Sequence, residues 1–264
     1  MNTVTSRTEP IARQLYEAAG TRVPIARPSD ARPDGTASLA GAYRIQQALI
    51  GRHMAAGDRI VGYKVAITTR ARLAAMSLAA PLAGKLLAGA GVASGGSIAA
   101  DALIGPRIEP EVAFVMKRSL RGPFCTFDDV YRATAHVAPA LEILDSRYVP
   151  GPFDAYSAVA DNVSSARHVI GTQRCALDGL DLARVGCALY RNGEVLATGA
   201  GAQVLGHPAY AVVELVNDLA TRGEGLEEGM VVMTGGWVEA SAANAGDDFR
   251  ASFHTLGDVS VRFG

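Results

Sequence analysis

Three glutamates in two separate segments are the residues whose types and spacing point most clearly to chemistry. Glu109 and Glu111 lie two residues apart in the segment from Pro106 to Phe114, so an extended strand would point both side chains to one face. Glu142 lies in the segment from Val137 to Asp145, which is otherwise almost wholly apolar, and a charge buried there must have a partner. Three carboxylates that meet would form an all-oxygen site of the kind that binds Mg²⁺ or Mn²⁺.

Each part of this metal hypothesis has a structural alternative. The two neighbouring glutamates could form the solvated face of an edge strand, with Pro110 marking the edge. Glu142 could instead belong to a structural ion pair with Arg147 or Arg107. The residues alone leave both alternatives open.

One lysine, Lys64, lies inside the apolar run from Gly62 to Val65. A lysine that is buried or next to a metal has a movable pKa and can carry a proton or place a fixed charge on an enolate. The alternative is a strand lysine whose stem is covered while its ammonium group reaches water.

The segment from Val159 to Arg167 is predicted to be a polar loop. Its polar groups suit a loop that holds a carboxylate or orders water, and the candidate substrate-binding residues in it are Asp161, Ser165 and Arg167. An ordinary surface turn is the alternative.

The segment from Met233 to Gly236 follows a predicted apolar strand. Here the hydroxyl of Thr234 and the bare backbone amides around Gly235 could face an anionic group of a substrate. Taken alone, this is a weak signal.

The first part of the chain is predicted to be helical, and two helices recur later. Apolar residues follow a helical period from Pro10 to Ala19, and a second apolar stripe runs from an N-cap at Ser38 to about Met54. Between them, a linker rich in proline, aspartate and arginine is expected from Pro24 to Gly35. The later helices are one from Thr126 to about Ala135, opened by a variant capping box, and one that begins at Pro208.

From Gly57 onward, short apolar runs separated by glycine, proline and aspartate predict strands. The predicted strands are Ile60 to Ile67, Ile108 to Met116, Val137 to Leu144, Val185 to Tyr190, Glu194 to Thr198, Met230 to Met233, Asp248 to Phe253 and Val259 to Phe263. The clearest element is a hairpin at Asn192-Gly193, because this pair readily adopts the positive φ angles of a type I′ turn. Strands and helices do not alternate regularly, so the pattern favours an α+β or mostly-β fold.

Composition and charge exclude several classes of protein. The chain has 264 residues, 49% of them hydrophobic, and a formal net charge of -1, which argues against disorder and against binding to nucleic acid or an anionic membrane. Dinucleotide, nucleoside triphosphate and α/β-hydrolase motifs are absent, and so is a secretory signal. No apolar run approaches the roughly 20 residues that span a bilayer. We therefore expect a soluble, cytoplasmic protein.

Several of these segments are similar to the motifs of a known family, the 2-keto-4-pentenoate hydratase and 4-oxalocrotonate decarboxylase branch of the fumarylacetoacetate hydrolase superfamily. They occur in the family's order over most of the chain. The matching segments are Gly62 to Val65, Pro106 to Phe114, Leu120 to Pro123, Pro139 to Arg147, Val159 to Asn162, Ser164 to Arg167, Asn192 to Val195, Gly199 to Ala202, Val204 to Pro208 and Val259 to Phe263.

The resemblance implies a helical N-terminal region, residues 1–58, ahead of a mixed β-roll core of the fumarylacetoacetate hydrolase C-terminal type, residues 59–264. The two parts would form one structural unit. The hydrolytic members of the superfamily carry a His-containing acid-base segment that has no counterpart here, which argues against hydrolysis of a C–C bond.

The resemblance also implies the contents of the active site. Glu109, Glu111 and Glu142 correspond to metal ligands, Lys64 corresponds to the active-site lysine, and the cofactor would be Mg²⁺ or Mn²⁺. The substrate would be a small 2-oxo acid or a dienol.

Within this branch, two motifs resemble the decarboxylases more than the hydratases. The segment from Met233 to Ala240 is similar to the decarboxylase pattern Met-Thr-Gly-Gly-Ile-Thr-Glu-Ala, and the segment from Ser164 to Arg167 shows the same preference. Hydratases often carry acidic residues where this chain has Ala79 and Leu82. Adding water needs a group that handles a proton, so this difference argues against hydration.

The expected reaction is therefore metal-dependent decarboxylation of 2-oxo-3-hexenedioate (4-oxalocrotonate) to 2-hydroxypenta-2,4-dienoate, in the meta-cleavage catabolism of aromatic compounds. Lys64 would stabilise or protonate the C2 oxygen of the substrate. Thr234 and Gly235 would orient the C1 carboxylate, and Arg167 would contact the distal carboxylate.

Two alternatives remain at this point. The chain could be a hydratase that converts 2-hydroxypenta-2,4-dienoate to 4-hydroxy-2-oxopentanoate, or a catalytically weak partner subunit of a hydratase-decarboxylase complex. A homo-oligomer is expected in each case, with a hydratase or decarboxylase as a further partner enzyme.

Overall fold

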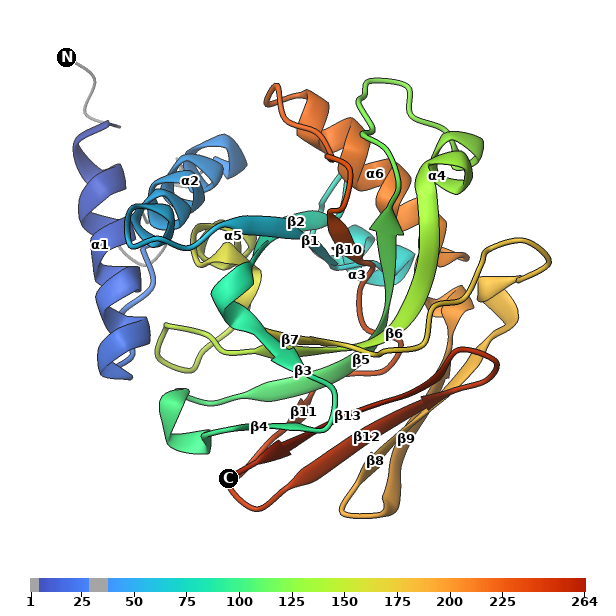
Figure 1. Ribbon diagram of the computed structural model, residues 1–264. Coiled ribbons are helices and arrows are strands. Elements are labelled where there is room, and N and C mark those ends of the chain that lie inside the picture. The colour runs from blue at the N-terminus through green and yellow to red at the C-terminus, as the bar shows by residue number, and fades with distance from the viewer. Residues whose placement is uncertain (1–4, 29–37) are drawn as a thin grey trace.

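The long strands β5 (Arg107–Met116) and β6 (Thr134–Leu144) pair antiparallel at the centre of the larger of two sheets in the computed structural model (Figure 1). The structure describes residues 5–28 and 38–264. Within these residues, the larger sheet has eight strands, in the order β2-β1-β10-β5-β6-β7-β3, with β11 paired to β5. Its other strands are β1 (Ile60–Ala66), β2 (Leu82–Leu87), β3 (Gly91–Ala93), β7 (Ser165–Ile170), β10 (Val231–Met233) and β11 (Ser241–Ala242).

A second sheet packs against the first, and the apolar side chains between them form the main core. Its strands, in the order β4-β13-β12-β8-β9, are β4 (Gly96–Ile98), β8 (Gly186–Arg191), β9 (Glu194–Ala200), β12 (Asp248–Phe253) and β13 (Gly257–Phe263). Phe114 and Val137 of the first sheet and Phe249 of the second are fully buried in this core. The main core thus fixes the two strands that carry the glutamates.

The N-terminal helices pack at one end of the larger sheet, away from the second sheet (Figure 1). They are α1 (Thr5–Thr21) and α2 (Leu39–Ala55), and α2 also packs against α5 (Ala155–Ala160). A separate apolar cluster holds them to the sheet. It includes Leu15, Ile45, Leu82, Tyr156 and Val163.

This cluster draws side chains from both parts of the chain. Leu15 comes from the helical region, whereas Leu82 comes from β2 of the larger sheet, and both are almost fully buried. We propose that residues 1–58 and residues 59–264 form one structural unit, because separating them would expose this cluster to water.

The later helices begin where the sequence predicts. Thr126 and Asp129 form a capping box ahead of α4 (Phe127–Ala133). α6 (Pro208–Ala220) has Pro208 in its first turn, and the His207 ring accepts a backbone N–H as the N-cap. The helices and the two mixed sheets confirm the α+β prediction.

The predicted hairpin is also confirmed, since Asn192 and Gly193 join β8 to β9 with φ angles of 54° and 87°. The first helix begins at Thr5, earlier than the predicted Pro10. The predicted linker from Pro24 to Gly35 lies outside the described residues from position 29 onward. No helix within residues 5–28 and 38–264 is long and apolar enough to cross a bilayer.

The prediction of a polar loop from Val159 to Arg167 is wrong. The helix α5 continues to Ala160 and the strand β7 begins at Ser165, so only a short connection lies between them. The polar residue Asp161 is fully buried there because it pairs with a buried arginine.

The structure also adds elements that the sequence did not predict. The strand β2 is buried along its whole length, so its apolar residues show no alternation that would mark a strand. The other additions are the strands β3, β4, β7 and β11 and the short helices α3 (Arg70–Ala75) and α5.

Candidate metal and active site

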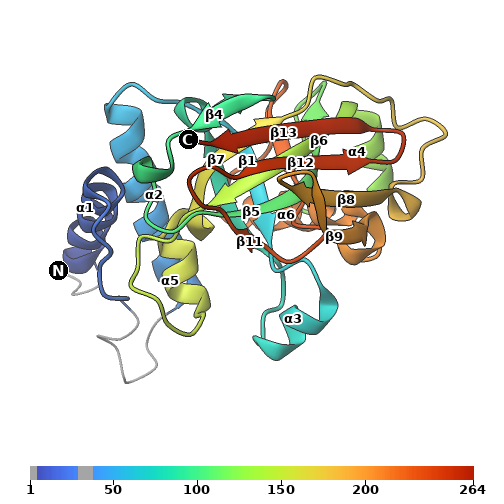
Figure 2. The same ribbon diagram turned by 90° about the horizontal axis from the view of Figure 1, so that it is seen from below.

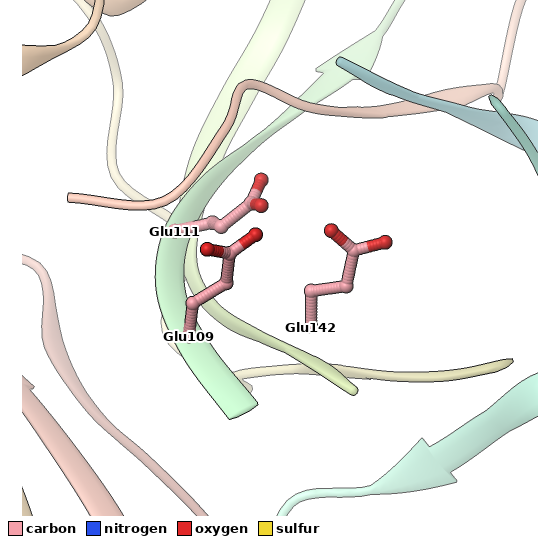
Figure 3. Close-up of side chains that lie close together, drawn as sticks. All are labelled: Glu109, Glu111 and Glu142. Carbon is pink, nitrogen blue, oxygen red and sulfur yellow. The ribbon is translucent and has the colours of Figure 1, made fainter. Parts of the chain in front are cut away.

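The three predicted glutamates converge, as the sequence suggested. In the register of β5 and β6, Glu109 lies directly opposite Glu142, and Glu111 lies two residues further along β5 on the same face. One carboxylate oxygen from each residue lies within 4.8 Å of the others. Figure 3 shows the three carboxylates pointing toward one another from the two strands.

The edge-strand alternative for the glutamates is wrong. Glu111 and Glu142 are fully buried, and β5 lies inside the sheet, between β6 on one side and β10 and β11 on the other. Within the described residues, Oε1 of Glu111 and Oε1 of Glu142 accept no hydrogen bond. Buried oxygens without a donor need a cation or a bound ligand, so this cluster fits a divalent metal ion.

Burial and repulsion between the carboxylates raise the pKa values of Glu109 and Glu111. Burial raises the pKa of Glu109 to about 7, and the charge of Glu142 adds to that rise. Burial likewise raises the pKa of Glu111 well above its usual value. A metal ion must displace these protons, so metal binding and deprotonation are linked.

Lys64 lies beside the glutamates. Its side chain is only 1% exposed, and its Nζ lies 3.0 Å from Oε2 of Glu142. Nζ also donates a hydrogen bond of 3.1 Å to the backbone carbonyl of Val163. The alternative of a lysine that reaches water is therefore wrong, and the third N–H of the ammonium group is left for a ligand.

Neither arginine considered as a partner of Glu142 fills that role. Arg147 forms a buried ion pair with Asp161, and Arg107 donates to the backbone carbonyl of Ala240. The lysine of β1 is the partner of Glu142, which no local sequence pattern reveals.

A strained segment holds the carbonyl that Lys64 contacts. Asn162, Val163 and Ser164 have φ angles of 51°, 53° and 58°, and a β-branched residue such as valine rarely adopts this left-handed conformation. The Asn162 amide secures the segment, because its side chain pairs with both the backbone N–H and the backbone carbonyl of Lys85. Strain of this kind persists only where the surroundings enforce it, as they do next to Lys64.

Two glycines are required by the packing next to the glutamates. Gly235 has a φ angle of 104°, and its N–H donates a hydrogen bond of 2.7 Å to Oε2 of Glu111. A Cβ on Gly236 would lie 2.3 Å from Oε2 of Glu109. The Gly-Gly pair therefore lets the backbone approach the carboxylates.

Pro110 lies in a gap of the sheet, not at its edge. On this side of β5, β10 pairs from Ala113 onward and β11 pairs with Ile108, so the residues between them lack a ladder partner. The chain from β10 to β11 bridges the gap, and the Trp237 N–H donates to the carbonyl of Pro110 at 2.9 Å. A proline is tolerated there because no N–H is needed.

Glu109 and Lys64 line a cavity of about 630 Å³. Its polar lining includes Thr68, Thr69, Ser146, Ser164 and Gln203, and its apolar lining includes Leu144, Phe153, Trp237 and Val238. Two arginines that sequence reasoning did not assign to the substrate, Arg72 and Arg107, also line it. Ala79 and Leu82 do not, so the positions that are often acidic in hydratases lie outside this lining.

The side chain of Thr234, a predicted substrate-binding residue, contacts the backbone of β5. Its hydroxyl donates a hydrogen bond of 3.0 Å to the backbone carbonyl of Val112, and its side chain is fully buried. Thr234 thus fastens the end of β10 to β5, while the adjacent Gly235 reaches the glutamates.

The other predicted substrate-binding residues lie away from the glutamates. Arg167 is opposite Ile143 in the register of β6 and β7, so it occupies the face of the sheet that Glu142 does not. Arg167 and Ser165 line a second, smaller cavity of about 220 Å³. Asp161 contacts Arg147 and lines neither cavity.

Replacing Arg147 with methionine is expected to destabilise the protein by about 3 to 5 kcal/mol, because Asp161 would remain buried without a counter-ion. Burial raises the pKa of Asp161 to about 6 even with Arg147 present. Without the arginine it rises further, so Asp161 becomes neutral more readily. The free energy of unfolding lost by the variant should be smaller at a pH of about 5 than at about 8.

Urea unfolding of both proteins at the two pH values measures this loss. Replacing Arg262, whose ion pair with Asp248 is exposed, is the control and should cost less than about 1 kcal/mol. An equal loss for the two arginine variants would contradict the assignment.

No protein-family model matches the chain. It is 42% identical over 226 residues to a 4-oxalocrotonate decarboxylase from Pseudomonas putida, covering 86% of each chain. It is 35% identical over 259 residues to a 2-oxo-hept-4-ene-1,7-dioate hydratase from Escherichia coli, covering 96% of each. The structure of 4-oxalocrotonate decarboxylase from Pseudomonas putida G7, complexed with magnesium and adipate, matches with a TM-score of 0.94 and 37% identity over 98% of both chains.

Proposed function

Because the chain belongs to the 2-keto-4-pentenoate hydratase and 4-oxalocrotonate decarboxylase branch of the fumarylacetoacetate hydrolase superfamily, we propose that it decarboxylates 2-oxo-3-hexenedioate to 2-hydroxypenta-2,4-dienoate. The observation that carries this proposal is the convergence of three glutamates and a buried lysine beside one cavity. The higher identity to the decarboxylases than to the hydratases supports the choice of reaction.

The residues present fit the magnesium that a related decarboxylase binds. Glu109, Glu111 and Glu142 would hold the ion, since one oxygen of each lies near the others and Oε1 of Glu111 and Oε1 of Glu142 have no donor within the described residues. When bound, a divalent cation supplies a Lewis acid that draws electrons toward the C2 oxygen of a 2-oxo acid.

The protein groups then bind and orient the substrate. In the reaction, the bond between C5 and C6 breaks, CO₂ leaves, and the electron pair passes through the conjugated chain to the C2 oxygen. The third N–H of Lys64 would face that oxygen and stabilise its negative charge before protonation. The apolar side chains of Leu144, Trp237 and Val238 exclude water from the conjugated chain.

Purified protein with Mg²⁺ and 2-oxo-3-hexenedioate tests the proposal directly. We expect release of CO₂ together with the ultraviolet absorbance of the dienol product. The hydratase alternative, which the relatives near 35% identity favour, predicts loss of added dienol without CO₂. A catalytically weak partner subunit would give neither reaction at a useful rate.

Removal of the metal should lower thermal stability. Mg²⁺ at about 100 times its dissociation constant would stabilise the folded protein by about 2.7 kcal/mol, or about 5 to 10 °C in melting temperature, because it binds the native glutamate cluster and not the unfolded chain. Differential scanning fluorimetry with added Mg²⁺ and then with a chelator measures the shift. An unchanged melting temperature at saturating Mg²⁺ and Mn²⁺ would contradict the metal site.

We also propose that the enzyme is a cytoplasmic homo-oligomer and that a hydratase acts as its partner, consuming the dienol. Its described cysteines are free thiols, which suits a reducing compartment. Exposed apolar side chains such as Phe124 and Val195 offer contact surface for assembly. Sedimentation of the protein alone, and then with a hydratase, would measure both associations.

A further inference from the structure

Three cationic side chains line the large cavity, and they differ in whether they already have partners within the protein. Lys64 lies against Glu142 and the Val163 carbonyl, and Arg107 donates to the carbonyl of Ala240. Within the described residues, the guanidinium of Arg72 has no hydrogen bond or ion pair. Arg72 is thus a cation that faces the cavity and is available to a ligand.

The position of Arg72 is set by the strand that carries Lys64. After β1, the backbone turns at Ile67, which has a φ angle of 61°, and the Thr69 hydroxyl accepts the N–H of Arg72 at 3.3 Å. The helix α3 then stands off from the two sheets beside the cavity (Figure 2). The turn and the cap therefore hold Arg72 at the cavity lining, while the glutamates lie deeper.

The outer part of the cavity carries more positive than negative charge. Besides Glu109 and Lys64, its charged lining residues are Arg72, Arg107 and Glu239, all exposed to solvent. A second carboxylate, from a ligand, would complete the charge balance there.

We propose that Arg72 binds the distal carboxylate of a dicarboxylic 2-oxo acid whose other end lies at the three glutamates. This inference rests on the proposed function, since it concerns the same cavity. Guanidinium groups bind carboxylates through two parallel N–H donors, which fixes both the position and the orientation of the carboxylate. Arg72 thereby selects a dicarboxylate over a monocarboxylate of equal length.

Binding of two inert probes isolates the distal carboxylate. With Mg²⁺ present, isothermal titration calorimetry would compare 2-oxohexanedioate with 2-oxohexanoate, which has the same chain and 2-oxo acid head but a methyl group at the far end. Arg72→Leu is expected to weaken binding of the dicarboxylate by about 10- to 100-fold and to leave binding of the monocarboxylate within about twofold.

Two further variants sharpen the test. Arg70→Leu removes a neighbouring exposed arginine of the same helix that does not line the cavity, and it should change neither affinity. Arg72→Lys keeps the charge but not the paired donors, so it should restore only part of the lost dicarboxylate affinity. In enzyme kinetics, Arg72→Leu should raise the KM for 2-oxo-3-hexenedioate.

The outcomes separate this inference from the proposed function. If the wild-type protein decarboxylates the substrate and Arg72→Leu weakens both probes equally, or neither, the role of Arg72 is wrong while the function stands. If Arg72→Leu weakens binding of the dicarboxylate alone but the wild-type protein does not decarboxylate the substrate, the proposed reaction is wrong while the role of Arg72 stands. Equal wild-type affinity for the two probes would overturn the selectivity outright.

Discussion

Replacing Glu111 with glutamine is expected to lower kcat/KM for decarboxylation by about 10³-fold, because an amide oxygen is a poor replacement for a carboxylate that ligates Mg²⁺. The substitution keeps the shape of the side chain and an acceptor for the N–H of Gly235. Steady-state kinetics at several Mg²⁺ concentrations would show whether added metal restores any activity.

A second measurement excludes simple unfolding of this variant. Burial raises the pKa of Glu111, so keeping this carboxyl group inside the metal-free protein costs stability near neutral pH, and glutamine removes that cost. The metal-free variant should therefore melt at or above the temperature of the metal-free wild type, whereas Mg²⁺ should no longer raise it. Glu194→Gln, at the exposed end of a hairpin strand, is the matched control and should change neither property. Full activity of Glu111→Gln in chelated buffer would refute the metal site.

Replacing Lys64 with methionine is expected to lower kcat by about 10²- to 10⁴-fold, the range that a positioned proton-transfer group contributes. The physical reason is that no other cation lies against Glu142 with a free N–H toward the cavity in the part of the chain that the structure describes. Presteady-state and steady-state measurements of CO₂ release would give kcat directly.

Metal binding distinguishes a role in the reaction from a role in holding the site together. Without Lys64, Glu142 loses its internal counter-ion, so Mg²⁺ should raise the melting temperature of Lys64→Met at least as much as that of the wild type. Lys117→Met removes an exposed lysine far along the chain and serves as the control. A variant that lost metal binding together with activity would indicate that Lys64 acts only by maintaining the cluster.

The convergence of the three glutamates could be predicted from the sequence for a simple physical reason. The period of two in a strand places Glu109 and Glu111 on one face, and the apolar surroundings of Glu142 require a partner for its charge. Both arguments are local. The register of β5 and β6 confirms the shared face, and the ion pair with Lys64 supplies the partner that Glu142 requires.

The remainder of the site depends on contacts between distant segments, which local patterns do not contain. The partner of Glu142 comes from β1, far away in the sequence, and was sought among nearby arginines. Arg167 was assigned to the substrate from its polar neighbours, yet its place in β7 puts it on the face opposite to that of Glu142. Arg72 lies in no recognisable sequence motif, and only its position beside the cavity identifies it as a candidate substrate contact.

In the fold, too, the elements that depend on neighbouring residues were predictable and those that depend on distant contacts were not. Helix caps and the Asn192-Gly193 turn depend on neighbouring residues, and they lie where the sequence predicts. The strand β2 was missed because it is buried on both faces and so lacks alternation. The prediction of a polar loop before β7 is wrong because a buried ion pair allows Asp161 to lie in the interior.

The gap in the sheet at Pro110 has a consequence for how such enzymes can diverge. The strand β5 holds the glutamates through its pairing with β6, whereas the bridge from β10 to β11 crosses the gap without contributing to the ladder. Substitutions at Val238 and Glu239 can therefore reshape the cavity wall while β5 and β6 hold the glutamates, whereas Gly235 and Gly236 of the same bridge contact the carboxylates and leave no room for a side chain. One short connection thus contains both a part fixed by the glutamates and a part that can change the shape of the cavity without altering the strands.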